Sequence, residues 1–586
     1  MTLSQRIAQE NHFNTHDGVA LFYRHWPAAG PRRGAIVLFH RGHEHAGRMA
    51  HLVDELDLPD FDFFAWDARG HGRSPGVRGW SPSFGTSVRD VQTFIDHIGT
   101  QHGVPASDLH VVAQSVGAVL AATWVHDYAP PIRGLTLASP AFKVKLYAPF
   151  ARTGIALMQK LRGPFFVNSY VKPKFLTHDE ARIASYQSDP LISRPIASNI
   201  LLGLYEAAER VVADAQAITV PTQLLISGAD WVVHARPQHD FFDRLGSVVK
   251  TREVLPGFFH DTLGERDRAG AVRSVRGFVL QGFDWPVPAV DLREAHLRGA
   301  TADESRALAA PLSPISPRGA YWALTRAGLR CGGWLSEGVA LGHATGFDSG
   351  STLDYVYRNE ARGVSPIGRL IDRNYLDSIG WRGIRQRKLH VEELLRDATT
   401  RLAAAGRDVR MLDIAAGHGR YVLDAVQASP VKPSRIVLRD YSEINVRDGR
   451  ALIATKGLGQ IASFVQADAF DRASLAATQP QPTIGVVSGL YELFPDNEMV
   501  SRSLAGLADA IEAGGYLVYT GQPWHPQLEL IARALTSHRQ GQAWVMRRRT
   551  QGEMDQLVAA AGFRKITQRI DEWGIFSVSL AERLPA

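Results

Sequence analysis

A serine lies between an apolar segment and a run of small residues, where its hydroxyl group could act as a nucleophile. The segment Leu109–Ala113 precedes Gln114 and Ser115, and Gly117 follows two residues later. A strand, a sharp turn and a helix in this order form a nucleophile elbow, with Ala113 at the position of the more usual glycine. A serine buried at a strand end gives the same pattern, so the prediction depends on partner residues.

Two further residues could activate this serine. A serine hydroxyl is a weak nucleophile until a histidine accepts its proton and a carboxylate holds the imidazole. Asp230 follows the apolar run Leu224–Ser227, and His260 lies on the loop after another apolar run. Ser115, Asp230 and His260 follow one another in the chain order of hydrolase triads. We predict them as nucleophile, orienting acid and base, with Asp261 as an alternative acid.

The loop after the first buried strand could stabilise the oxyanion of an attacked ester. The backbone N–H of Gly42 could act there together with the N–H of Val116. His40, His43 and His45 lie in the same loop and raise the alternative of a metal site. Because the triad accounts for the chemistry and no spaced carboxylates complete a ligand set, we expect no metal.

A glycine-rich turn in the second half of the chain could bind a nucleotide-type ligand. Asp413, Ala415, Gly417 and Gly419 carry this turn between a strand and a helix, which allows close approach of the backbone. No Gly-Lys-Ser/Thr follows, so a P-loop is excluded. Val422 occupies the third glycine position of a dinucleotide loop. A tight turn without a ligand is the simple alternative.

Two acids follow this loop at the ends of the next two strands. Asp440, with Tyr441 beside it, lies about 20 residues past the loop, where a carboxylate can hold ribose hydroxyls. Asp468, with Ala469 beside it, ends the third strand and could bind an adenine amino group.

Parallel β-sheets are needed to position both sets of residues. Short apolar runs alternate with helical patterns, which indicates sheets that are covered on both faces. The expected strands are 35–39, 61–66, 109–113, 134–138, 222–227 and 251–255, then 409–414, 435–438, 462–465, 484–488 and 516–519, with a hairpin over 566–571 and 575–580.

Three motifs in the first half resemble those of the monoacylglycerol lipase and lysophospholipase group of α/β-hydrolases, which is similar to the serine aminopeptidase family. The motifs are Glu44–Arg48, Asp67–Ser74 and Gly257–Leu263. The resemblance spans about residues 10–284. It implies an acyl ester hydrolase with a cap over the active site, supplied by about residues 143–215.

Besides Ala113, three residues depart from the motifs of that group. Its oxyanion turn has glycine where this chain has Arg41 and His43, and its nucleophile turn has histidine where this chain has Gln114. The triad itself remains whole. In the cap, Tyr147–Phe166 is apolar over much of its surface, and we expect either a helix packed on the core or a lid that binds acyl chains.

The glycine-rich loop resembles the Asp/Glu-x-Gly-x-Gly-x-Gly motif of Rossmann-like class I methyltransferases, with Ala415 at the first glycine. The resemblance covers about residues 390–586 and implies S-adenosyl-L-methionine as the cofactor. Position by position, it places Asp413 and the loop against the methionine part, Asp440 against the ribose and Asp468 against the adenine.

Methyl transfer is an in-line displacement, so the enzyme must hold the acceptor in attack geometry and exclude water. We expect the acceptor wall after the fourth and fifth strands, where Tyr491, Glu492, Trp524 and His525 lie. Glu492 or His525 could be a general base, and a purely structural polar role is the alternative for both.

The length of 586 residues favours two domains. Residues 285–317 contain five prolines and no long apolar period, so we expect a linker there. We predict an α/β chain in which residues 1–284 form an α/β-hydrolase fold with a helical cap. Residues 318–586 then form a Rossmann-like class I methyltransferase fold, with a helical part over about 318–390.

Composition and charge exclude several classes of protein. Hydrophobic residues at 45% and charged residues at 21% argue against disorder. The net charge of +6 forms no basic stripe with stacking aromatics, so we expect no nucleic acid partner. Residues 354–388 carry a net charge of 8 − 4 = +4. Together with Arg547–Arg549 they form either a solvated helical face or a site for an anionic acceptor.

The sequence gives no sign of a membrane span or a signal peptide. The single cysteine, Cys331, cannot form an internal disulfide bond, and we expect a cytoplasmic protein. Contact with a phospholipid surface stays open. The oligomeric state, the ester and the methyl acceptor do not follow from the sequence.

We predict a bifunctional enzyme that hydrolyses a monoacylglycerol-like or lysophospholipid-like ester and methylates a related small or lipid-like acceptor. Fusion of two enzymes raises the local concentration of a shared intermediate, so we expect the ester and the methyl acceptor to be related. The alternatives are one active domain joined to a ligand-binding or regulatory module, and a hydrolase joined to a nucleotide sensor.

Overall fold

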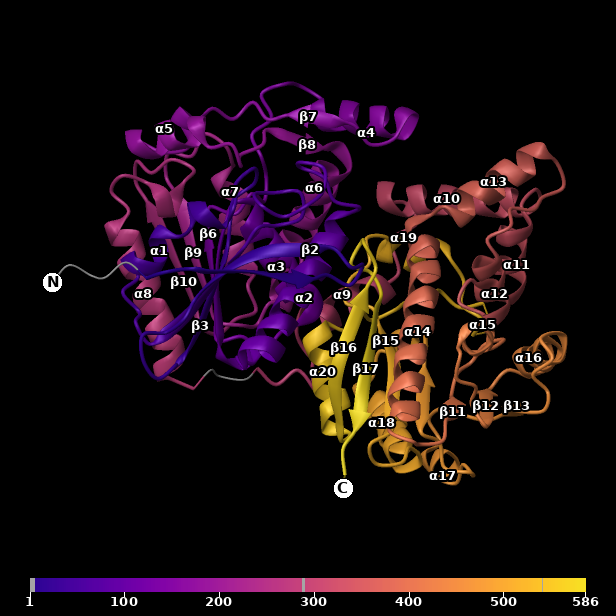
Figure 1. The fold of residues 1–586 in the computed structure, drawn as a ribbon. Helices are drawn as coiled ribbons and strands as arrows, with labels where there is room; N and C mark the ends of the chain where they lie inside the picture. The colour runs from indigo at the N-terminus through magenta and orange to yellow at the C-terminus, as the bar shows by residue number, and fades with distance from the viewer. Residues whose placement is uncertain (1–5, 287–289, 540, 586) are drawn as a thin grey trace. The chain divides into compact units, whose positions relative to one another are not determined.

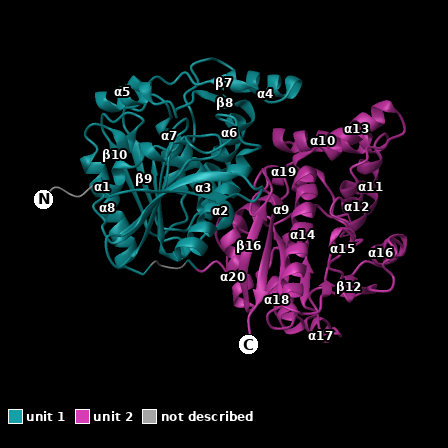
Figure 2. Cartoon of the chain, viewed as in Figure 1, with its two compact units in different colours: residues 1–290 teal, residues 291–586 magenta. Residues whose placement is uncertain are grey.

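The computed structural model describes residues 6–286, 290–539 and 541–585. The chain forms two compact units, unit 1 over residues 1–290 and unit 2 over residues 291–586 (Figure 2). Each unit has its own sheet and its own core.

Unit 1 contains an eight-stranded sheet with the order β1-β2-β4-β3-β5-β6-β9-β10 (Figure 1). β2 pairs antiparallel with β1 and β4, and all other neighbours are parallel. The strands are β1 (Gln9–Asn14), β2 (Ala20–Trp26), β3 (Gly34–Phe39), β4 (Phe61–Trp66), β5 (Leu109–Gln114), β6 (Gly134–Ala138), β9 (Thr222–Ser227) and β10 (Lys250–Leu255).

The central strands of this sheet are buried along their whole length, which requires cover on both faces. This confirms the six strands predicted for the first half. The sequence analysis did not predict β1 and β2. β1 is a mostly polar, exposed edge strand and so lacks a continuous apolar run. The surrounding helices are α1 (His51–Glu55), α2 (Phe84–His102), α3 (Val116–Tyr128), α7 (Ala235–Arg244) and α8 (Ala269–Asp284).

A cap is inserted between β6 and β9. Its helices are α4 (Ala151–Arg162), α5 (Glu180–Ser188) and α6 (Ser198–Ala213). Its short strands β7 (Phe166–Asn168) and β8 (Pro195–Ala197) pair with each other and not with the main sheet. α6 packs against α3, which anchors the cap over the main sheet.

Unit 2 contains a seven-stranded sheet with the order β13-β12-β11-β14-β15-β17-β16. β17 pairs antiparallel with β15 and β16, and all other neighbouring strands are parallel. Chain order reverses between β11 and β14, and this switch point is where open α/β sheets bind ligands. The predicted strands and the closing hairpin are confirmed as β11 (Arg410–Asp413), β12 (Arg435–Asp440), β13 (Ala462–Gln466), β14 (Ile484–Val487), β15 (Tyr516–Gly521), β16 (Phe563–Ile570) and β17 (Ser577–Arg583).

Helices cover this second sheet and precede it in the chain. A buried cluster joins the helices that precede the sheet to later parts of unit 2. It includes Trp381 on α14, Trp544 after α19 and Phe576 just before β17. The preceding helices are α9 (Ala300–Ala309), α10 (Pro317–Gly333), α11 (Glu337–Thr345), α12 (Gly350–Arg358), α13 (Pro366–Leu376) and α14 (Ile379–Ala404). The others are α15 (Arg420–Ala428), α16 (Glu443–Thr455), α17 (Arg472–Ala476), α18 (Asn497–Ala510), α19 (Leu528–Ala534) and α20 (Gln551–Ala560).

The segment predicted as a linker, residues 285–317, differs from that expectation. Residues 287–289 lie outside the described residues, but α9 lies within the segment and belongs to unit 2. Arg547 Nη1 donates a hydrogen bond to the buried hydroxyl of Thr301, 3.1 Å away, and α9 packs on α19. The prolines therefore flank an ordered helix and do not mark a free connection.

No helix among the described residues combines the length and the apolar character needed to cross a membrane.

Candidate active sites

Ser115 occupies the sharp turn between β5 and α3. Its backbone angles, φ +57° and ψ −116°, are rare for a residue with a side chain. The turn also brings Gly117 close to β3, since a Cβ there would lie 2.4 Å from the carbonyl oxygen of His40. This strained backbone holds the Ser115 side chain at the carboxyl edge of the sheet.

The three predicted triad residues lie within hydrogen-bond distance in unit 1. Ser115 Oγ is 2.7 Å from His260 Nε2, and His260 Nδ1 is 2.7 Å from Asp230 Oδ2. Burial alone would raise the pKa of Asp230. The His260 imidazole and the N–H groups of Val232 and Val233 instead hold that pKa below its ordinary value. A charged Asp230 can therefore orient the imidazole.

Asp261, the alternative acid, belongs to a buried ionic network instead. Arg182 Nε donates to Asp261 Oδ2 at 3.0 Å, and the Arg41 guanidinium lies 3.4 Å from the same oxygen. Gln114 Nε2 donates to Asp261 Oδ1 and to the carbonyl oxygen of His260. Burial would raise the pKa of Asp261, but both arginines lower it. The departures at positions 41 and 114 thus hold the loop that carries His260.

Arg41→Met is expected to lower the free energy of unfolding of unit 1 by about 3 kcal/mol, because the buried carboxylates of Glu44 and Asp261 lose a partner. Urea unfolding with pulse proteolysis measures this for each unit separately. In the control Arg252→Met, an exposed pair with Asp243 is removed, and a change below about 1 kcal/mol is expected. Equal effects of the two variants would contradict the structural role of Arg41.

The two predicted oxyanion donors lie beside each other. A Cβ on Gly42 would come within 3.0 Å of the Val116 side chain. Val116 is the first residue of α3, so its N–H has no acceptor within the helix. His43 adopts φ +70°, a conformation that favours glycine. Burial lowers the pKa of His43 to about 4, so its ring carries no charge next to Gly42 at neutral pH.

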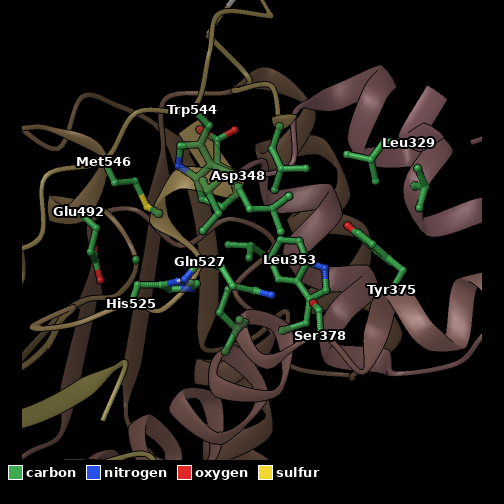
Figure 3. Close-up of a pocket in the computed structure, with 18 of the residues that line it drawn as sticks. Leu329, Asp348, Leu353, Tyr375, Ser378, Glu492, His525, Gln527, Trp544 and Met546 are labelled. Carbon is green, nitrogen blue, oxygen red and sulfur yellow. Dashed lines mark hydrogen bonds between the residues drawn. The ribbon is translucent and has the colours of Figure 1, made fainter. Parts of the chain in front are cut away.

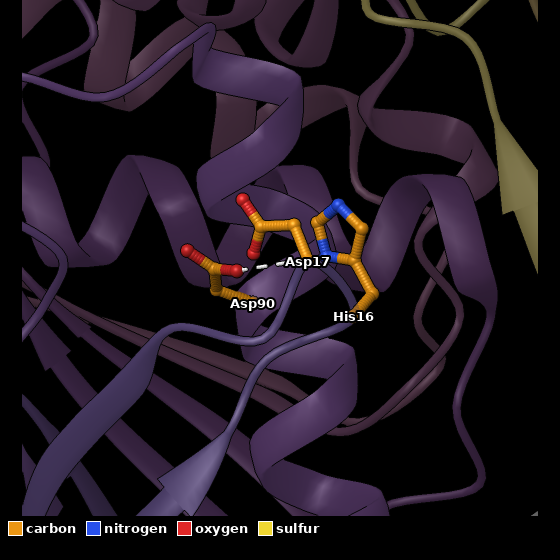
Figure 4. Close-up of side chains that lie close together, drawn as sticks. All are labelled: His16, Asp17 and Asp90. Atoms are coloured by element: carbon orange, nitrogen blue, oxygen red, sulfur yellow. Dashed lines mark ion pairs between the residues drawn. The ribbon is translucent and has the colours of Figure 1, made fainter.

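Within the described ranges, one cluster of side chains has the spacing of a metal-ligand group, and it excludes the three histidines after β3. It comprises His16, Asp17 and Asp90 (Figure 4). Arg69 donates hydrogen bonds to both carboxylates, at 2.8 to 3.0 Å. Because the positive charge of Arg69 offsets their repulsion, the carboxylates of Asp17 and Asp90 can lie close together without a metal ion.

The apolar stretch of the cap does not pack on the core. None of the residues of α4 is buried, and Leu157 and Leu161 are exposed by 59% and 75%. Phe150, just before the helix, is exposed by 87%. Lys160 and Arg162 lie in the last turn of the same helix. α4 therefore presents an apolar surface with a basic end.

A cavity of about 960 Å³ lies at the carboxyl ends of β11, β12 and β13 in unit 2. Asp440 organises its floor, because Oδ2 accepts the N–H of Gly417 at 2.9 Å and Oδ1 accepts from Ser442 and Asn445 at 3.0 Å. The other predicted cofactor residues that line this cavity are Ala415, Gly419, Tyr441, Asp468 and Ala469.

Asp413 does not line this cavity and supports the loop from behind. Its carboxylate accepts the N–H of Ala415 at 3.3 Å, and burial raises its pKa to about 7. Gly417 and Gly419 have φ angles of +57° and +75°. A Cβ on Gly419 would lie 2.4 Å from Leu438. The loop therefore needs glycine at both positions to pass over β12.

A second cavity of unit 2, of about 460 Å³, adjoins the first and shares Asp348, Leu353, Gly489 and Leu493 with it (Figure 3). Its walls come from α10, α13, α14, α19 and the loops after β14 and β15. Arg387, from the basic segment considered for an anionic acceptor, also lines it. The lining residues that sequence patterns did not single out for a site include Leu329, Ile384, Gln522, Ile531, Trp544, Met546 and Phe576.

Two of the four predicted acceptor residues line this second cavity, namely Glu492 and His525. The other two lie elsewhere. Tyr491 is buried, and its hydroxyl donates to Ser503 Oγ at 3.0 Å. Trp524 lies under the Arg548 guanidinium, which is 5.5 Å from its ring. Side chains after one strand end point in different directions, which sequence position alone does not reveal.

Arg547–Arg549, considered as an anion site, are buried and bound within unit 2. Arg547 pairs with Glu553, and Arg548 pairs with Glu304. Arg549 donates to the carbonyl oxygen of Tyr491 at 2.6 Å. These arginines hold the segment after β15 in place and are not a surface for an anionic acceptor.

The two sheets and their sites define a chain that joins an α/β-hydrolase unit to a class I methyltransferase unit. The chain belongs to the family described as "Putative methyltransferase", whose family model matches residues 275–583. The family described as "Serine aminopeptidase, S33" matches residues 30–267.

One relative extends over both units. The "Uncharacterized protein YnbC" of Escherichia coli is 57% identical over 581 residues, which is 99% of each chain. Two further relatives match the first unit. The monoacylglycerol lipase of Mycolicibacterium smegmatis is 23% identical, over 46% of this chain and 96% of its own. The human monoglyceride lipase is 29% identical, over 42% of this chain and 82% of its own.

Proposed function

We propose that the chain is a bifunctional enzyme. Unit 1 hydrolyses acyl esters of the monoacylglycerol or lysophospholipid type, and unit 2 transfers a methyl group from S-adenosyl-L-methionine to a small or lipid-like acceptor. The observation that carries the proposal is the hydrogen-bonded series from Ser115 through His260 to Asp230 at a strained elbow. The lipase names of the relatives of unit 1 support the class of ester.

In the hydrolase unit, His260 accepts the proton of Ser115 as Oγ attacks the ester carbonyl. Asp230 stabilises the imidazolium that forms. The N–H groups of Gly42 and Val116 receive the negative charge on the carbonyl oxygen. His260 then returns the proton to the leaving alcohol, and water releases the acyl group by the same steps.

In unit 2, the residues around the larger cavity fit S-adenosyl-L-methionine. Asp440 already organises the glycine loop, and its position at the end of β12 suits the ribose hydroxyls. Asp468, at the rim after β13, has an exposed side chain that can accept from an adenine amino group. When bound, the cofactor supplies an electrophilic methyl group. The two cavities adjoin each other and share the lining residues Gly489 and Leu493.

Two measurements on the purified chain test this proposal. Incubation with 1-decanoylglycerol should release decanoate, and a fluorophosphonate probe should label Ser115. Calorimetry should detect binding of S-adenosyl-L-methionine and no binding of NAD. A folded chain that neither reacts with the probe nor binds S-adenosyl-L-methionine would refute both assignments.

We also propose that α4 contacts a phospholipid surface. The double variant Leu157→Glu and Leu161→Glu is expected to weaken co-sedimentation with vesicles of phosphatidylcholine and phosphatidylglycerol at least about 10-fold, because two exposed apolar side chains are lost. The control Val248→Glu and Val254→Glu alters other exposed apolar residues of unit 1. Equal loss in both variants, or in neither, would contradict a specific role of α4.

A further inference from the structure

The second cavity of unit 2 has mainly apolar walls with a polar group at one end. In Figure 3, Glu492, His525 and Met546 lie at the left, and Leu329 and Tyr375 lie at the right. The cavity's volume, about 460 Å³, suits a ligand of ordinary small-molecule size. Its contact with the larger cavity through Gly489 and Leu493 gives such a ligand access to the methyl group of a bound cofactor.

Several buried polar atoms on this wall have no hydrogen-bond partner among the described residues. They are Glu492 Oε2, Arg387 Nε, Gln522 Nε2 and Trp544 Nε1. Each of these side chains is at least about nine-tenths buried. Leaving such groups unpaired is unfavourable, so their concentration around one cavity indicates the polar end of a ligand.

Glu492 is a candidate proton acceptor in this group. Its Oε1 accepts from Thr520 Oγ1 at 3.4 Å and lies 3.8 Å from Arg387 Nη1. Its Oε2 is the oxygen without a partner. The Arg387 guanidinium also lies over the Phe576 ring, 5.0 Å from its centre. A carboxylate with one oxygen fixed and the other open can receive a proton from a ligand.

His525 is a donor in the same cavity and not a second base. The N–H of Gln527 donates to His525 Nδ1 at 3.0 Å, so Nδ1 carries no proton. Burial lowers the pKa of His525 to about 4, which leaves the ring neutral at neutral pH. The proton of the neutral ring is therefore on Nε2, on the side of Gly380.

These contacts select the chemical class of the acceptor. Glu492 and Arg387 carry opposite charges that lie 3.8 Å apart and offset each other, so a neutral polar group fits beside the pair. A carboxylate ligand would meet the open oxygen of Glu492 and be repelled. An ammonium ligand would be repelled by Arg387, and it lacks a free electron pair for attack. A hydroxyl group can donate to Glu492 and accept from Arg387 or Gln522.

We propose that this second cavity binds the methyl acceptor, a mainly apolar molecule whose nucleophile is a hydroxyl group, and that Glu492 accepts the hydroxyl proton. The proposal rests on methyltransferase activity of unit 2. A new oxygen–carbon bond forms as the sulfur–methyl bond breaks, and the electron pair of that bond returns to sulfur. The proton passes to Glu492 Oε2 and later to solvent, and the product is a methyl ether.

Four probes with similar apolar bodies test the acceptor class. They are 4-octylphenol, 1-decanol, decanoate and decylamine, each offered with labelled S-adenosyl-L-methionine. We expect methylation of 4-octylphenol, of 1-decanol or of both, and no methylation of decanoate or decylamine. Faster methylation of the acid or the amine, or no methylation of any probe by a chain that binds the cofactor, would overturn the proposal.

Glu492→Gln tests the base and keeps the side-chain shape. We expect kcat for the preferred hydroxyl probe to fall at least about 100-fold, with the calorimetric Kd for S-adenosyl-L-methionine changed by less than about twofold. The control Glu498→Gln makes the same exchange at an exposed position six residues away. Retention of more than about a third of the activity in Glu492→Gln would overturn its role as a base.

Leu329→Trp tests the cavity by binding, without the reaction. Calorimetric titration of the cofactor-free chain with 4-octylphenol reports binding of the probe to the cavity. The larger side chain is expected to raise the Kd for the probe at least about 10-fold and to leave cofactor binding unchanged. An unaltered probe Kd would overturn the assignment of this cavity. Failure of the wild-type chain to bind S-adenosyl-L-methionine would instead refute the proposed function, and the acceptor site with it.

Discussion

Ser115→Ala is expected to lower kcat for hydrolysis of 1-decanoylglycerol by at least about 10⁴-fold, because no other group can form the acyl-enzyme ester. In the proposed mechanism Ser115 Oγ attacks the substrate and His260, whose Nε2 lies 2.7 Å away, accepts its proton. Release of decanoate, measured against spontaneous hydrolysis, gives the size of the effect. Labelling by a fluorophosphonate should be lost at the same time.

The control for this variant is Ser188→Ala, which changes an exposed serine at the end of α5. It should hydrolyse the ester at the wild-type rate. Binding of S-adenosyl-L-methionine by the Ser115→Ala variant should remain within about twofold of wild type, because the cofactor cavity lies entirely in unit 2. Hydrolysis that survives in the Ser115→Ala variant would show that another residue is the nucleophile.

Asp440→Ala is expected to weaken binding of S-adenosyl-L-methionine by about 100-fold or more. In the proposed site the variant would lose two charge-assisted hydrogen bonds to the ribose, each worth about 1.5 kcal/mol or more. It also removes the acceptor of the Gly417 N–H, so the glycine loop loses its support. Calorimetric titration of the purified variant measures the change in Kd.

Asp509→Ala is a matched control, since Asp509 is an exposed acid of unit 2 that pairs with Arg472. Its affinity for S-adenosyl-L-methionine should equal that of the wild type. Ester hydrolysis should be unaffected in both variants. An Asp440→Ala chain that binds the cofactor with wild-type affinity would place the cofactor elsewhere.

The positions of Ser115, Asp230 and His260 could be predicted from the sequence because each follows a strand of the parallel part of the sheet, namely β5, β9 and β10. In a parallel sheet the ends of such strands meet at one edge, so chain order alone brings these residues together. The same reasoning located Asp440 and Asp468. Residues at strand ends can be predicted in this way because the backbone, and not the direction of the side chain, fixes where they lie.

The second cavity of unit 2, proposed here to bind the acceptor, could not be predicted in this way. Arg387 comes from α14, Glu492 from the loop after β14, and Trp544 from an irregular segment after α19. No local period joins these three residues, because only tertiary packing brings them together. Trp524 was predicted for the acceptor wall and does not line the cavity. It follows β15 as expected, but its ring lies against Arg548.

The expected linker was also wrong for a physical reason. Prolines at 311, 314 and 317 suggested an irregular chain, yet Pro317 is the first residue of α10, where the absence of an N–H has no cost. Thr301 and Glu304 on α9 then supply partners for Arg547 and Arg548. Burial of these arginines in unit 2 could not be foreseen from their charge alone.

The network around Asp261 has a consequence for how such chains can diverge. Arg41, in the loop after β3, and Gln114, at the end of β5, both contact this one carboxylate. A lipase-type glycine at position 41 or a histidine at position 114, introduced alone, would leave Asp261 short of a donor, so the two positions are coupled. We infer that transfer of active-site segments from a lipase into this chain succeeds only when Arg41, Gln114 and the loop that carries Asp261 are exchanged together.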